Sequence, residues 1–338
     1  MSAINCGTAP DPQLKPVLTA RARLGEGPVW DERSQLLYWV DIYNHRVHQF
    51  NPETGRNRFI DVGETVGAIA LVESPNATDE SDTTKLIMAL RHGLAYLDLN
   101  TGDVIPIITV ETDKLNNRFN DGKCDIRGRF WFGSMCNDGK KEGMLYRYIS
   151  EHHNHGSHTS ACCSNNEVSV TNEAKDPLAK SNLTSMESGL KISNGLGWSP
   201  DNQTFYLTDS PLQTIFAYDF DEENGTMGDR RVLIDLTHES FFPDGLTIDA
   251  EGCLWVAMWD GWCVVRFDPT GKEISRIQLP VQRPTSCAFG GRDLNQLYIT
   301  TASIGLSEAQ IEASLWSGDL FCVETTIKGL PMNRFIQL

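Results

Sequence analysis

Residues 192–201, ISNGLGWSPD, alternate apolar and polar positions as a β-strand does, yet they place the carboxamide of Asn194 directly before Gly195. A strand interior favours β-branched or aromatic residues, and a glycine there weakens it. The same arrangement returns three times, as GEGPVWD from Gly25, NDGKCDI from Asn120 and PDGLTID from Pro243. In every copy an oxygen-bearing side chain precedes a glycine and a short apolar run. The repetition indicates that the chain is built from copies of one structural unit.

The unit consists of a turn, an aromatic-rich strand, a second turn and a further strand. Its central strands are predicted to begin near Leu37, Leu86, Phe130, Phe205, Leu254 and Leu297. Four of the five intervals are close to the ~40–50 residues of a four-stranded propeller blade. The sequence therefore predicts an all-β fold, a single six-bladed β-propeller of four-stranded antiparallel blades over residues 1–338. We expect residues 15–22, KPVLTARA, to pair with the last blade and close the ring.

The interval from Phe130 to Phe205 is too long for one blade. Its surplus is polar and poor in aromatic residues, so we interpret residues 151–189 as an inserted loop. Helical signal is weak elsewhere. The stretch LSEAQIEASLW from Leu306 predicts one short helix with Ser307 as its N-cap.

Composition excludes several classes of function. The formal net charge of -16 argues against a nucleic-acid partner, because such proteins gather Lys and Arg. No apolar run is long enough to span a membrane, and the N-terminus does not resemble a secretory signal. Most of the nine cysteines stand alone in expected strands, as buried thiols do in a reducing compartment: Cys124, Cys253, Cys263, Cys287 and Cys322. We expect a cytoplasmic protein, monomeric or weakly self-associating, without membrane or nucleic-acid partners.

The oxygen-bearing residues of the repeated phrase are predicted to form a ring. Innermost strands of a propeller run side by side along the axis, so equivalent positions meet at one end of the channel. Four of six such positions carry oxygen ligands, Glu26, Asp121, Asn194 and Asp244, with Asn120 one residue earlier. One Asx-Gly pair alone is ordinary turn chemistry. Four copies in register instead indicate a site for one divalent cation, Ca²⁺, Mg²⁺ or Mn²⁺, with Zn²⁺ or Fe²⁺ as alternatives.

The motifs LGEGPVWD, NRFNDGKCDIRGRFWFGSM, ISNGLGWSPD and PDGLTIDAEGCLWVAMW together resemble those of the senescence marker protein-30 (regucalcin), gluconolactonase and luciferin-regenerating enzyme family. The resemblance covers nearly the whole chain outside the insertion. It implies a six-bladed propeller that binds one divalent cation on its axis and hydrolyses sugar lactones. By motif position it implies the cation ligands Glu26, Asn194 and Asp244, with Asn120 as a further ligand, direct or through water. It likewise implies that Arg118, Asn120 and Asp121 contact substrate hydroxyls.

Lactone hydrolysis needs a polarised carbonyl, an activated water and a proton for the leaving alkoxide. A divalent cation provides the first and assists the second. Asp244 is the candidate catalytic base and acid, and the guanidinium of Arg118 is suited to substrate hydroxyls or a developing oxyanion. Phosphotriester or aryl-ester hydrolysis, and calcium binding without strong catalysis, are the alternatives. Trp259 and Trp262 are the tryptophans with a possible place near the pocket; Trp39, Trp131 and Trp255 are expected in the core.

Overall fold

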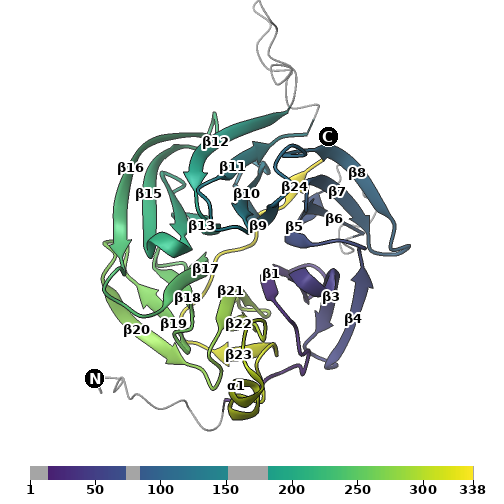
Figure 1. Cartoon of the computed structure of the whole chain (residues 1–338), viewed down its shortest axis with the longest axis vertical. Coiled ribbons are helices and arrows are strands. Elements are labelled where there is room, and N and C mark those ends of the chain that lie inside the picture. Colours follow the sequence, from purple (N-terminus) through teal and green to yellow (C-terminus); the bar gives the residue numbers. More distant parts are fainter. Residues whose placement is uncertain (1–13, 74–83, 151–181, 338) are drawn as a thin grey trace, which may run out of the picture.

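The computed structural model describes residues 14–73, 84–150 and 182–337, whose strands form six small sheets around a central axis (Figure 1). This confirms the six-bladed propeller. Blade 1 comprises β1 (Gly25–Asp31), β2 (Leu36–Asp41), β3 (Arg46–Asn51) and β4 (Arg56–Asp61). Blade 2 comprises β5 (Val66–Glu73), β6 (Lys85–Leu90), β7 (Gly93–Asp98) and β8 (Val104–Thr109). Blade 3 comprises β9 (Asn117–Cys124), β10 (Phe130–Cys136), β11 (Gly143–Tyr148) and β12 (Leu183–Leu190).

Blade 4 comprises β13 (Ser193–Trp198), β14 (Thr204–Asp209), β15 (Thr214–Asp221) and β16 (Thr226–Asp235). Blade 5 comprises β17 (Phe242–Ile248), β18 (Leu254–Trp259), β19 (Cys263–Phe267) and β20 (Glu273–Gln278). Blade 6 comprises β21 (Pro284–Gly290), β22 (Gln296–Thr301) and β23 (Phe321–Glu324). Pairing within each blade is antiparallel from the inner strand outward. The second strand of every blade begins within one residue of its predicted start. The apolar run of each second strand is a clear signal because all but one of its residues are buried.

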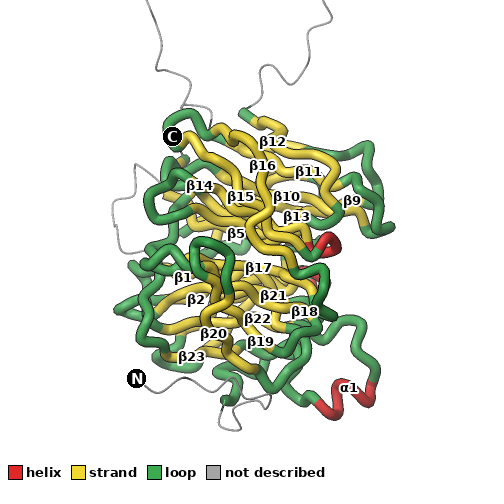
Figure 2. Tube along the Cα trace, turned by 90° about the vertical axis from the view of Figure 1, so that its left-hand side faces the viewer, coloured by secondary structure: helices red, strands yellow, loops and turns green. Residues whose placement is uncertain are grey.

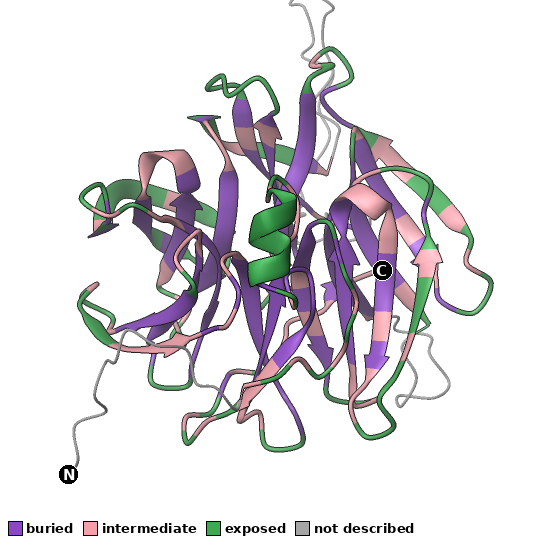
Figure 3. Ribbon diagram, turned by 60° about the horizontal axis from the view of Figure 1, so that its bottom comes forward, coloured by how far each residue is buried: buried purple, intermediate pink, exposed green. Residues whose placement is uncertain are grey.

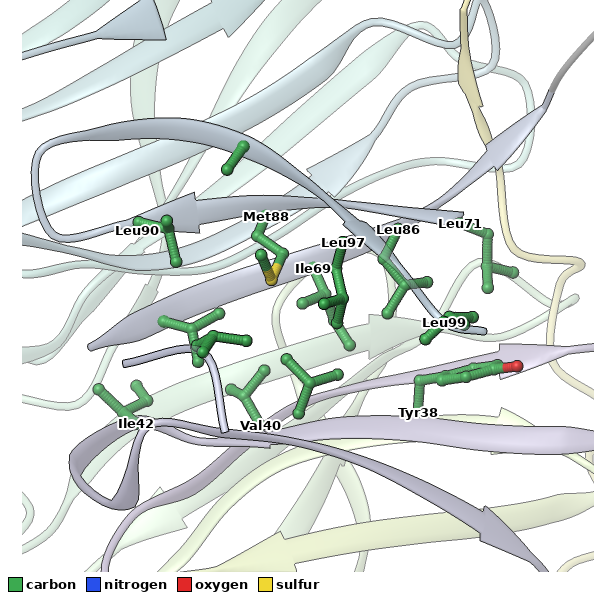
Figure 4. Close-up of a cluster of buried hydrophobic side chains, with 14 of the residues drawn as sticks. Tyr38, Val40, Ile42, Ile69, Leu71, Leu86, Met88, Leu90, Leu97 and Leu99 are labelled. Atoms are coloured by element: carbon green, nitrogen blue, oxygen red, sulfur yellow. The ribbon is translucent and has the colours of Figure 1, made fainter. Parts of the chain in front are cut away.

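Burial decreases from the axis to the rim of each blade. Every residue of β13 and β21 is buried, whereas none of β4 is. Figure 3 shows this as buried strands inside and exposed loops outside. Neighbouring blades bury their facing side chains against one another, as Figure 4 shows for blades 1 and 2. That cluster joins Tyr38 and Val40 of β2 to Ile69 of β5 and to Leu86 and Met88 of β6. Inter-blade packing of this kind supplies the core.

Both ends of the described chain contribute to ring closure. Leu18 forms an antiparallel bridge with Leu320 beside β23, and the N–H groups of both residues donate across it. The prediction that residues 15–22 complete the last blade is thereby confirmed. The C-terminal β24 (Phe335–Ile336) was not predicted. It pairs in parallel with Val72 and Glu73 of β5, and the segment that leads to it from blade 6 runs across the molecule to blade 2 (Figure 1).

Two local expectations have different outcomes. The short helix is confirmed as α1 (Glu308–Ala313), with Ser307 in a complete capping box. Figure 2 shows α1 projecting from the body of strands and loops. The expected insertion at residues 151–189 was drawn too long, since Leu183–Leu190 forms β12, the outer strand of blade 3. Residues 151–181 lie outside the described residues. The sequence did not predict this outer strand because polar residues occupy the exposed positions on both of its faces.

The inner strands β9 and β17 are each anchored at the C-terminal end by the same kind of side-chain network. Asp125 and Asp249 each follow such a strand, and each accepts a hydrogen bond from the indole N–H of a tryptophan six residues later, at 2.8 Å. Each aspartate also pairs with a buried arginine, Arg129 or Arg266. These networks fix the strands that carry several of the candidate site residues.

The six cysteines in the described ranges are free thiols, and five of them are buried. Cys322 is half-buried. Within residues 14–73, 84–150 and 182–337, no helix has the length and apolar character needed to cross a membrane.

Candidate functional site

A cavity of about 570 Å³ opens at the end of the channel where the inner strands begin. Five of the six residues predicted for the site line it: Glu26, Arg118, Asn120, Asn194 and Asp244. They come from blades 1, 3, 4 and 5, and each is less than a tenth exposed. The repeated sequence pattern therefore identified side chains that lie in one cavity although up to more than 200 positions separate them along the chain.

The side chains reach this cavity because every inner strand has a β-bulge near its beginning. The register between inner and second strand shifts at Glu26 in β1, at Phe119 in β9, at Asn194 in β13 and at Pro243 in β17, and β5 and β21 have equivalent shifts. A bulge leaves one or two residues unpaired and re-aims their side chains. The repeated phrase of the sequence is thus the signature of a bulge that turns a polar side chain toward the axis.

The glycine after each polar residue allows adjacent inner strands to approach closely. A Cβ on Gly195 would lie 2.4 Å from the carbonyl oxygen of Asp244, and one on Gly245 would lie 2.2 Å from Ser286 Oγ. Neither distance is compatible with a carbon atom at that position. The glycines therefore set the spacing between blades 4, 5 and 6 at the level of the site.

The polar groups of the floor are linked by hydrogen bonds. Asn194 Nδ2 donates to Ser210 Oγ at 3.0 Å and to the Asp244 carboxylate, and Asn194 Oδ1 accepts from Gly195 N at 3.0 Å. These contacts join β13 to β17.

On the opposite side, Arg118 Nη1 donates to Asn120 Oδ1 at 2.8 Å and to Phe119 O at 2.9 Å. Asn120 Nδ2 in turn donates to Ser193 O at 3.0 Å. Arg118 Nε is buried and has no hydrogen-bond partner within the described part of the chain. The cavity is thus lined by a buried guanidinium beside a carboxamide whose two polar atoms are already engaged.

Asp121 lies beneath the ring rather than in it, which differs from the position expected from the aligned motifs. The bulge of β9 falls between Phe119 and Asp121, so Asn120 reaches the cavity and Asp121 lines a much smaller space below. Its carboxylate accepts from Gly122 N at 2.7 Å. Lys123, also below, donates from Nζ to Leu246 O at 3.0 Å. A shift of one residue in register changes the level at which a side chain projects.

Burial and the repulsion between like charges raise the pKa values of the carboxyl groups in and beneath the floor. Burial raises the pKa of Glu26 well above its ordinary value, and the negative charges of Asp244 and Asp121 raise it further. Burial likewise raises the pKa of Asp244, against the hydrogen bond from Asn194 and the charge of Arg118. Burial raises the pKa of Asp121 too, with Lys123 opposing it. Like charges enclosed in this way favour either protonation or a cation.

The donor set of Glu26, Asn194 and Asp244, with Asn120 beside it, consists of carboxylate and carboxamide oxygens. Such oxygens are the ligands preferred by hard divalent cations, so the residues fit a cation of this type. No cluster of three or more His, Cys, Asp and Glu side chains suited to a metal occurs in the ranges that the structure describes. The candidate site differs from such a cluster because carboxamides supply part of its oxygen set.

Above the polar floor, the wall of the cavity is apolar. It is formed by Leu24, Tyr43, Met135, Ile192, Pro211, Phe242, Trp259 and Ile304. Of the two tryptophans considered from the sequence, Trp259 lines the cavity and Trp262 does not, while Trp39, Trp131 and Trp255 are buried in the core as expected. Arg118 lies over the ring of Tyr43 at 5.3 Å, and Arg283 over that of Trp259 at 4.6 Å.

Sequence reasoning missed Tyr43, Ser210 and Arg283 among the lining residues. Tyr43 and Ser210 belong to equivalent one-turn 3-10 helices, η1 (Ile42–Asn44) and η4 (Ser210–Leu212). Each helix follows an aspartate, Asp41 or Asp209, that accepts from two backbone N–H groups just before the inner strand of its own blade. The matching aspartates that end YWVD and YLTD are a signal that could have located both turns.

Comparisons with known proteins agree with the fold. Residues 24–303 match the family model described as SMP-30/Gluconolactonase/LRE-like region. The chain is 34% identical to regucalcin of Gallus gallus over 323 residues, which covers 93% of this chain and 95% of that protein. Among solved structures, a calcium-binding protein, regucalcin, from Agrobacterium tumefaciens has a TM-score of 0.81 at 25% identity, covering 95% of this chain and 97% of the other. A luciferin-regenerating enzyme has a TM-score of 0.76 at 28% identity, covering 94% and 96%.

Proposed function

The chain belongs to the SMP-30/gluconolactonase/LRE-like family, and from this premise we propose that it is a divalent-cation-dependent hydrolase that opens sugar lactones to hydroxy acids. One observation carries the proposal. Glu26, Asn194 and Asp244 line the floor of a cavity whose floor also holds the buried guanidinium of Arg118. An oxygen-rich cation site beside a positively charged guanidinium is suited to a carbonyl on which negative charge develops.

Glu26, Asn194 and Asp244, with Asn120 adjacent, would hold the cation, and the calcium-binding relative supports Ca²⁺ as the first ion to test. A divalent cation in such a site polarises a carbonyl and lowers the pKa of water. The other requirements fall to side chains of this chain.

Asp244 is the candidate general base and acid. Water adds to the lactone carbonyl carbon, the ring C–O bond breaks, and the proton removed from water is returned to the ring oxygen, which becomes the hydroxyl of the product. Asp244 lies in the floor with its carboxylate hydrogen-bonded to Asn194, so its position is fixed. Arg118, whose guanidinium lines the cavity, would hold the carbonyl oxygen or a ring hydroxyl.

The names of the relatives favour one further candidate, calcium binding without strong catalysis. This reading does not require a cavity beside the ligands or a guanidinium that lines it.

A pH-indicator assay with a panel of aldonolactones tests the proposal. Protein stripped of metal would be resupplied with Ca²⁺, Mg²⁺, Mn²⁺, Zn²⁺ or Fe²⁺ and compared with Asp244→Ala and Arg118→Lys. The expected result is cation-restored turnover that Asp244→Ala lacks and that Arg118→Lys reduces about 10²-fold, the scale for loss of one oxyanion donor. Arg118→Lys should retain cation binding in calorimetry. Cation binding with every lactone left at its spontaneous rate would instead favour the binding-only candidate.

A matched control is Asp219→Ala, which removes an exposed carboxylate that pairs with Arg231 at the surface of blade 4. Its turnover should equal that of the unaltered protein. Equal losses in Asp219→Ala and Asp244→Ala would contradict the role given to Asp244.

A further inference from the structure

The cavity is divided into a polar floor and an apolar wall. All of its carboxylates and carboxamides lie in the floor, whereas the side chains above come from five blades and are almost all apolar. Tyr43, Ile192, Phe242, Trp259 and Ile304 are each half-buried, with part of their surface facing the cavity. A volume of about 570 Å³ falls in the range of ~300–1,000 Å³ of pockets that bury drug-sized ligands. The wall therefore encloses space beyond a single lactone ring.

Few polar atoms remain available to a ligand that fills this space. Both polar atoms of the Asn120 carboxamide are engaged, and Ser210 Oγ accepts from Asn194. Arg118 Nη1 donates to Phe119 O and Asn120 Oδ1. Arg283 is held by Asp260 at 2.6 Å through its Nε and by Ile304 O through Nη1. A hydroxyl buried without a partner is unfavourable, whereas an apolar group in the same place gains from leaving water.

The part of the wall that Trp259, its largest residue, forms is already in place before a ligand binds. The guanidinium of Arg283 lies over the ring of Trp259, and the ion pair with Asp260 holds that guanidinium in place. The indole is thus supported by a charged group that is already neutralised. A rigid apolar surface binds an apolar group without a cost for ordering its own side chains.

We propose that the site takes a second class of substrate besides sugar lactones: lactones that carry an alkyl or aryl substituent on the ring carbon next to the ring oxygen. The inference rests on the proposed function, since the floor must open the lactone. The ring lies on the floor with its carbonyl toward Arg118, and the substituent lies against Phe242, Trp259 and Ile304. Hydrolysis then proceeds with the same bonds formed and broken as for a sugar lactone.

The first test is a substrate series with one ring and a growing chain: δ-valerolactone, δ-hexalactone, δ-octalactone and δ-decalactone, beside glucono-δ-lactone, with the cation that supports turnover. Burial of each added methylene group should raise kcat/KM by up to ~4-fold, chiefly through a lower KM. A kcat/KM that stays flat or falls along the series, while glucono-δ-lactone is hydrolysed, overturns this inference and leaves the proposed function intact. Spontaneous rates for all five lactones with every cation overturn both.

Variants give a second, independent readout. Ile304→Asn places a polar group on the wall and should lower the ratio of kcat/KM for δ-decalactone to that for δ-valerolactone by about 10-fold or more, as expected when a chain loses apolar contact. Ile311→Asn makes the same change on the exposed face of α1, outside the cavity, and should leave the ratio unchanged. A ratio that changes equally in both variants, or in neither, contradicts the assignment of the wall. The ratio is measured on folded protein, so a general loss of activity does not imitate the effect.

Discussion

Replacing Gly195 with alanine is the most direct test of why a glycine stands at the beginning of an inner strand. The added Cβ would lie 2.4 Å from Asp244 O and 2.8 Å from Leu246 N, and both neighbours are backbone atoms of β17. Ordinary contacts of a Cβ begin near 3.4 Å, so β13 and β17 must separate by about 1 Å. Overpacking of this kind costs ~1–3 kcal/mol of stability.

The functional effect should exceed the effect on stability. Asn194 precedes the altered residue and Asp244 provides the clashing carbonyl, so the separation moves two proposed cation ligands apart. A misplacement of ~1 Å can reduce turnover by ~10²-fold. We expect Gly195→Ala to lose turnover on this scale, with a weaker affinity for the cation measured by calorimetry.

Gly197→Ala is the matched control, two residues further along the same strand. Its Cβ would meet only side-chain atoms of Ile248 and Leu246, at 3.3 and 3.4 Å. Those side chains can adjust, and alanine also restricts the unfolded chain, so the free energy of unfolding should change by no more than ~1 kcal/mol. Urea denaturation and the lactone assay measure both variants. If Gly195→Ala and Gly197→Ala behave alike in both measurements, close approach of the strands is not the reason for the glycine.

Three further predictions concern the anchors, the carboxyl groups and the ring closure. Asp249→Ala removes the buried acceptor shared by the Arg266 guanidinium and the Trp255 indole N–H, and leaves Arg266 only its pair with exposed Glu251, so urea denaturation should show a loss of ~3–5 kcal/mol; a loss below ~1 kcal/mol would contradict the anchoring role. In the cation-free protein the pKa values of Glu26 and Asp244 are raised, so the folded state binds more protons than the unfolded state, and stability should fall as pH rises from about 4 through the folded-state values. A cation that needs both carboxylates ionised recovers this loss, so the rise in melting temperature on adding Ca²⁺ should be larger at pH 8 than at pH 5, and an equal rise would count against the site. Deleting residues 1–22 removes the strand partner of Leu320 and should lower the melting temperature in calorimetry, whereas an unchanged transition would show that closure does not depend on it.

The architecture was predictable because it repeats. Each blade carries the same succession of turn and strongly apolar strand, and six copies of a unit that cannot bury its own faces specify a ring. The oxygen-bearing residues of the cavity floor were predicted in the same way, since Glu26, Asn194 and Asp244 occupy equivalent places before a glycine. Local signals also sufficed for α1, where Ser307 and Gln310 form a capping box.

Other features depend on contacts that no local pattern encodes. The level of Asp121 follows from where the bulge of β9 falls, and moving that bulge by one residue would exchange its place with Asn120. The parallel pairing of β24 with β5 joins segments more than 250 residues apart, and its short strand has no periodicity to announce it. The apolar wall is assembled from one or two residues of each of five blades, so only the closed ring brings them together. By itself, the sequence determined the repeated unit and the polar residue that each unit turns to the axis. The tertiary structure alone decided which of those residues share a level and what surface stands above them, because both depend on strand register and on the packing of one blade against the next.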